Sequence, residues 1–242
     1  HGFPLSGLLW AHLPEALADR YRLIVPDLHG LGRSSVTDEV TMAGFADDLS
    51  GLLDQLDQAE PVVVMGLSMG GYIAFEFFRR HQRRVRALIL ADTRAEPDAP
   101  EAARQRSETA QKVLAEGSGV VADAMAGKLF GPGASTELRE QWRQIMASSD
   151  RQGVAAALRA MRDRADSRPT LGDIDVPTLV VVGQDDALTP LACAETIHRG
   201  IRGSRLEVVP GAGHMTPVEQ PEQFRQIVGG FLDELYEHAP AG

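Results

Sequence analysis

The sequence has little of three things: cysteine, long apolar runs and positive charge. Its single cysteine, Cys193, can form no disulfide within the chain and no metal cluster of thiolates. Such cysteine usage is typical of a reducing compartment, so we expect a cytoplasmic protein. No apolar run is long enough to span a bilayer. The formal net charge of −10 argues against nucleic acid or an anionic membrane as a partner, because both need basic patches.

What the chain does have is enough length and apolar content for one large α/β domain, with 242 residues of which 43% are hydrophobic. Five short apolar runs predict parallel strands that are covered on both faces. These runs are Arg22–Pro26, Pro61–Met65, Val85–Ala91, Thr178–Val182 and Arg205–Pro210. Apolar stripes at helical spacing lie between or after them, around residues 45–56, 73–78 and 224–235. The sequence therefore predicts a doubly wound, mostly parallel sheet.

Residues 94–168 break this alternation of strand and helix. They contain no strand pattern, and apolar residues recur at helical spacing over 121–129, 138–146 and 154–161. We therefore expect residues 94–168 to form a helical cap, inserted into a core domain of residues 1–93 and 169–242. A cap of this kind covers a site and excludes water, although its apolar stripes could also serve only to pack onto the core.

The motif with the clearest chemistry is Gly66-Leu67-Ser68-Met69-Gly70, a Gly-x-Ser-x-Gly pattern. It follows an apolar run and precedes a helical pattern, which is the context of a serine held on a sharp strand-to-helix turn. The flanking glycines let the turn close and let strand and helix approach each other. Ser68 is therefore the candidate nucleophile, and near neutral pH it needs a base and a group that orients the base.

His214 is the candidate base, and Asp186 is the candidate acid that orients it. His214 lies in the glycine-rich loop after the last expected strand, and Asp186 follows the expected strand Thr178–Val182. Ser68, Asp186 and His214 thus all follow the carboxyl ends of parallel strands, which meet at one edge of a sheet. Their order along the chain is the order expected for a serine on such a strand-to-helix turn.

Each of these residues also has a simpler interpretation. His214 could be a solvated loop histidine, and Asp186 could cap the helix expected after Thr189. Asp185 could be the acid in place of Asp186. Asp92, which follows the strand Val85–Ala91, is expected to be structural.

The tetrahedral intermediate of acyl transfer needs hydrogen-bond donors for its oxyanion. One candidate is the backbone N–H of Met69, at the start of the helix after the serine, where the helix dipole adds to the attraction. The second is the backbone N–H of Phe3, in the early loop His1-Gly2-Phe3-Pro4. This chemistry needs no metal and no organic cofactor.

Taken together, these residues resemble the α/β-hydrolase family over essentially the whole chain. The resemblance rests on His1-Gly2-Phe3-Pro4, the turn over 27–35, the serine motif, the acid loop over 183–190 and the loop over 211–214. It implies that Ser68, Asp186 and His214 form the catalytic triad, with Phe3 and Met69 at the oxyanion hole. Within the family, the cap and Ala91-Asp92-Thr93 are similar to the small esterase and 3-oxoadipate enol-lactonase group. A serine nucleophile is unlike the aspartate of the haloalkane dehalogenase and epoxide hydrolase branches.

The beginning of the chain departs from the family pattern. In the family, two strands precede a third that runs directly into the His-Gly motif. Three strands with tight connections amount to roughly 20–30 residues, and they are absent here. The third strand would lie between the strand that ends at Asp27 and the one that ends at the serine turn, so its loss would leave two ladders of backbone groups unpaired. We therefore expect a fragment of a longer gene product, less stable and less active than a version with the segment restored. The sequence also leaves a signal peptide open.

The predicted function is hydrolysis of a carboxylic ester or lactone of a small, largely apolar substrate through an acyl-enzyme. The apolar residues expected in the substrate pocket are Trp142, Met146, Met125 and Met215. Arg94, Arg162 or Arg164 could bind a substrate carboxylate. Alternatives on the same fold are hydrolysis of an enol-lactone or an acyl-homoserine lactone, hydrolysis of a C–C bond, and perhydrolysis. The alternative from another class is a non-catalytic ligand-binding protein, and the oligomeric state is left open.

Overall fold

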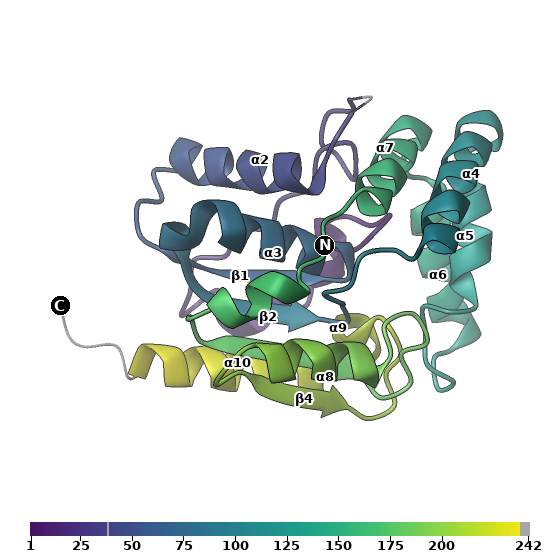
Figure 1. The fold of residues 1–242 in the computed structure, drawn as a ribbon. Helices are drawn as coiled ribbons and strands as arrows, with labels where there is room; N and C mark the ends of the chain where they lie inside the picture. The colour runs from purple at the N-terminus through teal and green to yellow at the C-terminus, as the bar shows by residue number, and fades with distance from the viewer. Residues whose placement is uncertain (38, 238–242) are drawn as a thin grey trace.

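The computed structural model describes residues 1–37 and 39–237, and its central feature is a parallel sheet. Within these residues the sheet has four strands in the order β1-β2-β3-β4, each parallel to its neighbours (Figure 1). The strands are β1 (Val62–Leu67), β2 (Val85–Ala91), β3 (Thr178–Gly183) and β4 (Arg205–Val209). The α/β fold class and these four predicted strands are therefore confirmed.

Helices cover both faces of the sheet because side chains alternate along its buried strands. On β2, Leu88 and Leu90 pack into one apolar cluster, whereas Ala87 and Ile89 pack into another. The first cluster includes side chains of α2 (Met42–Gln55), α3 (Met69–His81) and α8 (Leu191–Gly200), and the second includes those of α1 (Leu13–Leu17) and α10 (Pro221–Glu237). The apolar stripes predicted from the sequence are thus the buried sides of α2, α3 and α10.

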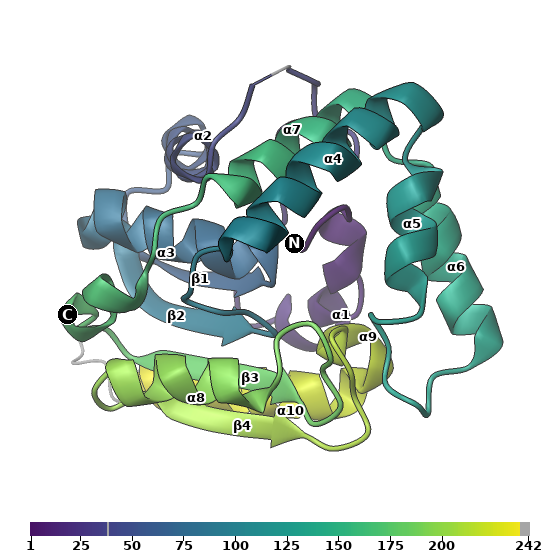
Figure 2. The same cartoon turned by 45° about the vertical axis from the view of Figure 1, so that its right-hand side comes forward.

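The described part of the chain places four α-helices between β2 and β3 in the sequence. These are α4 (Pro100–Glu116), α5 (Gly119–Ala126), α6 (Thr136–Ala147) and α7 (Arg151–Arg162). α4 packs against α7, and α5 packs against α6. Figure 2 shows them grouped on the side toward which the arrow of β2 points. No apolar stripe marked α4 in the sequence, because its buried side chains are Ala110 and Val113. That these helices form a separate cap domain over residues 94–168 stays a prediction.

The remaining elements are short. They are the 3₁₀ helices η1 (Gly7–Trp10), η2 (Gln82–Arg84) and η3 (Arg168–Asp173), and the single turn α9 (Thr216–Glu219). The loop between β4 and α9 carries His214, so α9 begins directly beyond the candidate base. Among the described residues, no helix combines the length and the apolar character needed to cross a membrane.

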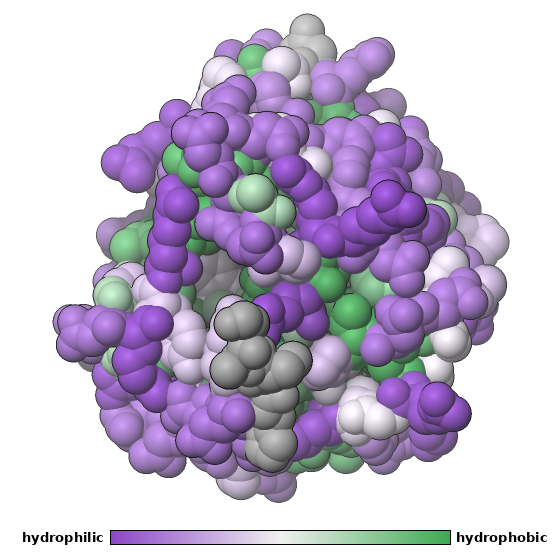
Figure 3. Space-filling model, turned by 90° about the vertical axis from the view of Figure 1, so that its left-hand side faces the viewer, coloured by the Kyte–Doolittle hydropathy of each residue, from purple (hydrophilic) through white to green (hydrophobic). Residues whose placement is uncertain are grey.

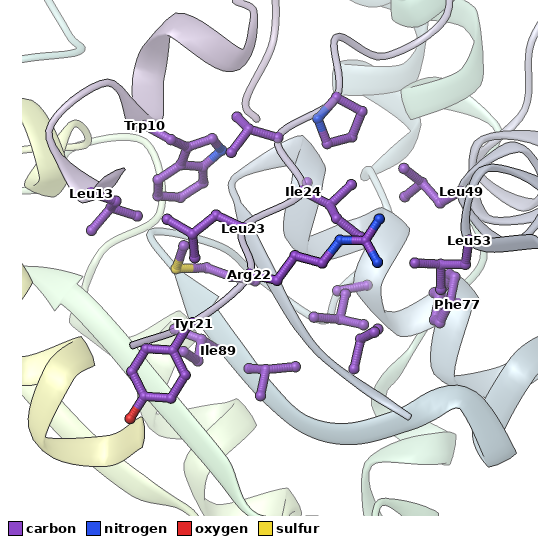
Figure 4. Close-up of a pocket in the computed structure, with 18 of the residues that line it drawn as sticks. Trp10, Leu13, Tyr21, Arg22, Leu23, Ile24, Leu49, Leu53, Phe77 and Ile89 are labelled. Atoms are coloured by element: carbon purple, nitrogen blue, oxygen red, sulfur yellow. The ribbon is translucent and has the colours of Figure 1, made fainter. Parts of the chain in front are cut away.

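The prediction of a strand at Arg22–Pro26 is wrong, since the structure has no strand there. An extended segment becomes a strand only when a neighbouring backbone pairs with it. Residues 21–26 instead line a largely apolar cavity of about 350 Å³, which β1 borders as well. Figure 4 shows Leu23 and Ile24 among the side chains that line it. The cavity lies between this segment and β1, the strand that leads to Ser68.

The lining of this cavity reaches the surface at two apolar side chains, Val25 and Tyr236, each of which is 42% exposed. Tyr236 is the last but one residue of α10. Figure 3 shows the side of the molecule on which α10 ends, and this face is mostly hydrophilic with apolar side chains visible in its middle. Apolar groups are thus partly open to solvent on this side.

A buried cluster of charges joins α3, α4 and the segment after α7. The Asp98 side chain, which is 5% exposed, pairs with Arg106 of α4 and lies 2.7 Å from Arg164 Nη1. Arg164 also donates to Glu96 O over 3.0 Å, and its guanidinium lies 4.3 Å from the centre of the Tyr72 ring. Because α3 carries Tyr72, this cluster fixes the inserted helices to the sheet domain.

Replacing Asp98 by alanine is expected to destabilise the fold by about 3–5 kcal/mol, because Arg106 and the buried Arg164 would lose their anion. Urea unfolding followed by circular dichroism at pH 7 measures this change. The matched control is Glu140→Ala, which removes an exposed partner of Arg143 and should leave the unfolding midpoint unchanged. Equal midpoints for Asp98→Ala and the wild type would show that the cluster does not stabilise the fold.

Candidate active site

Ser68 lies at a strained turn directly after β1. Its backbone has φ 55° and ψ −112°, and a positive φ is unfavourable for a residue with a Cβ. The helix α3 begins at the next residue, Met69. A Cβ on Gly66 would lie 2.1 Å from Gly70 O, so glycine is needed where β1 and α3 approach each other. The strand, serine and helix predicted from this motif are therefore in place.

His214 and Asp186 form a buried, hydrogen-bonded pair. The His214 Nδ1–H donates to Asp186 Oδ2 over 2.8 Å, and both side chains are almost completely buried. The Thr189 hydroxyl donates to the same Asp186 oxygen over 2.6 Å, while Asp186 Oδ1 accepts the backbone N–H groups of Leu188 and Thr189. With Nδ1 as the donor, His214 Nε2 carries the lone pair that a general base needs.

The charges of this pair stabilise each other. Burial raises the pKa of Asp186, but hydrogen bonds from His214 and Thr189 and the charge of His214 outweigh this effect, so the pKa of Asp186 is lowered. Burial lowers the pKa of His214, but the hydrogen bond and charge of Asp186, together with the charge of Asp92, outweigh it and raise the pKa. The buried carboxylate therefore stabilises the imidazolium that forms when His214 takes a proton.

The structure distinguishes the two candidate acids on this loop. Asp185 is exposed, and its backbone N–H donates to Ala212 O over 2.8 Å. Asp186 is the carboxylate that contacts His214. Its bonds to the backbone of Leu188 and Thr189 are those of a capping turn, although α8 itself begins later, at Leu191. The Asp186 carboxylate thus orients the imidazole and also binds the backbone of its own loop.

The loop over residues 1–4 lies beside Ser68. A Cβ on Gly2 would lie 3.5 Å from Ser68 Cβ. The His1 ring holds this loop in place, because its Nε2 accepts the Leu28 N–H over 2.9 Å and its Nδ1–H donates to Gly2 O over 3.0 Å. The early loop predicted to supply an oxyanion donor is therefore next to the candidate nucleophile.

Phe3 follows Gly2, which lies beside Ser68, and Met69 follows Ser68 in the sequence. Met69 is the first residue of α3, where a backbone N–H has no partner within the helix. Within the described residues, neither the Phe3 N–H nor the Met69 N–H donates to an acceptor. Both groups are thus available to a ligand, and their role as oxyanion donors stays a prediction.

The three candidate triad residues lie at one edge of the sheet, after the carboxyl ends of β1, β3 and β4. Within the described residues, the hydrogen bonds of the His214 ring go to Asp186 and Thr189, and none joins it to Ser68. Catalytic hydrogen bonds are often long in unliganded enzymes and tighten when substrate binds. The catalytic roles of Ser68, Asp186 and His214 stay predictions.

Glu219 is a residue that the sequence pattern did not point to. Its Oε1 accepts the N–H groups of Gly213 and Met215 over 2.9 and 3.1 Å, and its Oε2 accepts the Gly131 N–H over 2.7 Å. The His214 N–H donates to Leu129 O over 2.8 Å. The loop that carries His214 is therefore bound to the segment between α5 and α6. No local signal marked Glu219, because its partners are distant in sequence or are backbone groups.

The four residues predicted to line the substrate pocket are brought together. Trp142, Met146 and Met215 are buried in one apolar cluster, and Met125 packs against it. Met215 follows His214, so this cluster extends from the candidate base to α6. That these side chains contact substrate stays a prediction.

The three arginines considered for a substrate carboxylate have different surroundings. Arg162 pairs with Asp163, and Arg164 is buried against Asp98. Arg94 is half-buried and donates to Leu188 O, in the loop that holds Asp186. Its charge acts to lower the pKa of His214, although burial is the largest influence in that direction. Arg94 is therefore the arginine of the three that lies near the candidate site.

The site combines a serine on a strand-to-helix turn with a buried histidine–aspartate pair at the same edge of the sheet. This arrangement is typical of hydrolases with an α/β fold. Residues 1–221 match the family described as alpha/beta hydrolase fold. The chain therefore belongs to the α/β-hydrolase family.

Named relatives include esterases and enol-lactonases. The 3-oxoadipate enol-lactonase 1 of Acinetobacter baylyi is 29% identical over 230 residues, which cover 94% of this chain and 84% of that protein. A thermophilic esterase from Thermogutta terrifontis, solved with malate bound, is 43% identical with a TM-score of 0.95, over 97% of this chain and 88% of that one. The enol-lactonase from Burkholderia xenovorans is 28% identical with a TM-score of 0.87, over 96% and 88%. The predicted resemblance to this group is confirmed.

Proposed function

We propose that this protein is a serine hydrolase that cleaves carboxylic esters or lactones of small, largely apolar molecules through an acyl-enzyme. The observation that carries the proposal is the buried His214–Asp186 pair, which leaves His214 Nε2 as a base at the edge of the sheet where Ser68 occupies its strained turn. The likeness to an esterase and to enol-lactonases supports the same class of reaction.

The reaction proceeds in two half-reactions. Ser68 Oγ attacks the substrate carbonyl carbon while His214 Nε2 takes the hydroxyl proton, and Asp186 orients the imidazole and stabilises its charge. The N–H groups of Phe3 and Met69 bind the oxyanion. His214 then protonates the leaving oxygen as the C–O bond breaks. Water repeats the sequence on the acyl-enzyme, which releases the acid and restores Ser68.

A fluorophosphonate probe tests this proposal, because it labels a serine that a neighbouring base has activated. We expect one covalent adduct per chain, located on Ser68 by peptide mass spectrometry, and turnover of p-nitrophenyl acetate or p-nitrophenyl butyrate. A panel of simple lactones run beside these esters separates the two substrate classes. Absence of labelling and of turnover on every ester and lactone would instead support a non-catalytic ligand-binding protein.

A second candidate function is hydrolysis of a lactone or ester that carries its own carboxylate. Arg94 favours it, because this half-buried guanidinium lies near His214 and can bind an anion there. Arg94→Gln is expected to raise KM for mono-p-nitrophenyl succinate about tenfold or more and to change that for p-nitrophenyl acetate far less. Arg162→Gln is the control that leaves both unchanged. Equal effects of Arg94→Gln on the two esters would refute this role.

The proposed partner is a small-molecule substrate alone, with neither nucleic acid nor a membrane. The net charge of −10 supports this part of the proposal. We propose a cytoplasmic location because a chain with one cysteine can form no internal disulfide, which is typical of proteins in a reducing compartment. Fractionation of native cells followed by immunoblotting tests the location.

A further inference from the structure

Asp92 is a second buried carboxylate at the edge of the sheet where the candidate triad lies. It directly follows β2, its φ is 44°, and its side chain is fully buried. Asp92 Oδ1 accepts the Gly183 N–H over 2.9 Å. Asp92 Oδ2 accepts the Thr216 hydroxyl over 2.6 Å and the Thr216 N–H over 3.2 Å. Asp92 therefore accepts three hydrogen bonds from two different segments.

These two segments are the ones that carry the acid and the base. Gly183 ends β3 and lies three residues before Asp186. Thr216 begins α9 and lies two residues after His214. Through these bonds a single carboxylate fixes both loops to the end of β2, next to the strand that leads to Ser68.

The burial of Asp92 is costly, which argues that its charge has a use. All three hydrogen-bond donors are neutral groups. Burial raises the pKa of Asp92 to about 7, although the charge of His214 and the hydrogen bonds from Thr216 and Gly183 act to lower it. The positive φ adds backbone strain at the same residue. An asparagine would bury no charge, but its NH2 group would face the N–H of Gly183 or of Thr216 and could not accept a hydrogen bond from it.

Several charged and titratable groups surround His214. Asp186 faces it from the acid loop, and Asp92 faces it from the end of β2; both charges raise its pKa. The charge of Arg94 acts in the opposite direction. Glu219 binds the backbone on both sides of His214. The Cys193 thiol, near Arg94 and Asp186, stays neutral because burial raises its pKa. Asp92 is thus one of two carboxylates that stabilise the protonated imidazole.

We propose that Asp92 is a positioning residue of the hydrolytic site, which holds the Asp186 and His214 loops in register and, when ionised, strengthens His214 as a base. This inference rests on the proposed function for its catalytic consequence. Its electrostatic part concerns the titration of His214, which can be measured without turnover.

The first test is Asp92→Asn, which removes the charge and also one accepted hydrogen bond, because its NH2 group faces an N–H donor on either side. We expect the titration of the His214 ring, followed by ¹⁵N NMR, to move down by about one pH unit. The acid limb of the pH profile of kcat/KM for p-nitrophenyl acetate should move down with it. Asp185→Asn is the control, because it removes a charge from an exposed position on the same acid loop. It is expected to change neither the titration of His214 nor the pH profile of kcat/KM. A folded Asp92→Asn protein with an unchanged His214 titration would overturn the proposal.

The second test separates the hydrogen bond from the charge and does not depend on Asp92→Asn folding. Thr216→Val removes the hydroxyl donor and is expected to lower kcat about tenfold by loosening the His214 loop, whereas Thr216→Ser keeps the donor and should retain kcat within about twofold. Wild-type kcat in Thr216→Val would also overturn the proposal. If the wild type takes no fluorophosphonate label, the proposed function fails, while the NMR titration still decides whether Asp92 acts on His214.

Discussion

Replacing Ser68 by alanine is expected to lower kcat/KM for p-nitrophenyl butyrate by about 10⁴- to 10⁶-fold. Without its hydroxyl the turn after β1 offers His214 no proton to take and the acyl group no oxygen to join, so both half-reactions are lost. What remains is the smaller acceleration that the oxyanion donors and substrate binding give to attack by water. Steady-state kinetics with purified protein measures the change, and intact-mass analysis should show that the fluorophosphonate adduct is lost as well.

Ser148→Ala is the matched control for this variant. Ser148 is an exposed serine at the end of α6, where its hydroxyl donates to Ile145 O. Its loss should leave both the rate and the labelling unchanged. A Ser68→Ala protein that melts like the wild type and keeps its rate would remove Ser68 from the mechanism and, with it, the proposed acyl-enzyme.

Asp186→Asn is expected to lower kcat about 10³- to 10⁴-fold with a smaller effect on KM. The asparagine amide would donate to His214 Nδ1, which places the ring hydrogen on Nε2 and leaves no lone pair to accept the serine proton. The charge that stabilises the imidazolium is lost at the same time. The bonds from Leu188 and Thr189 to Oδ1 can persist, so the loop should keep its shape.

Asp185→Asn makes the same chemical change at the neighbouring position and should keep kcat within about twofold, because Asp185 is exposed and Asp186 is the acid that contacts His214. The pair of variants thus decides between the two acids that the sequence allowed. A large loss in Asp185→Asn with a small loss in Asp186→Asn would assign the orienting role to Asp185 and contradict the geometry of the loop.

The candidate site shows where reasoning from sequence succeeds. The turn at Ser68 was predictable because its determinants are local: an apolar strand, two glycines and a helix within about ten residues. The positions of Asp186 and His214 were predictable because loops after parallel strands share one edge of the sheet. Glu219 and the hydrogen bonds of Asp92 were not predictable, since their partners are backbone groups or lie in other segments and no short pattern encodes them.

The wrong strand prediction has the same cause. Arg22–Pro26 has the composition of a strand, but a strand also needs a paired neighbour, and this segment borders a cavity. The helix α4 lies within residues 94–168, which were predicted to be helical, but its bounds were not predictable because its buried side chains, Ala110 and Val113, form no long apolar stripe. For Arg22–Pro26 the deciding interaction lies outside the segment itself.

The sequence by itself determined the alternation of strands and helices, the serine turn and the loops from which an acid and a base emerge, because periodicity, glycine and chain order act over a few residues. Only the tertiary structure decided that Asp186 rather than Asp185 contacts His214 and that Asp92 and Glu219 bind the loops around it. Those choices depend on which backbone and side-chain groups meet across the sheet edge, and that is a property of packing between distant segments.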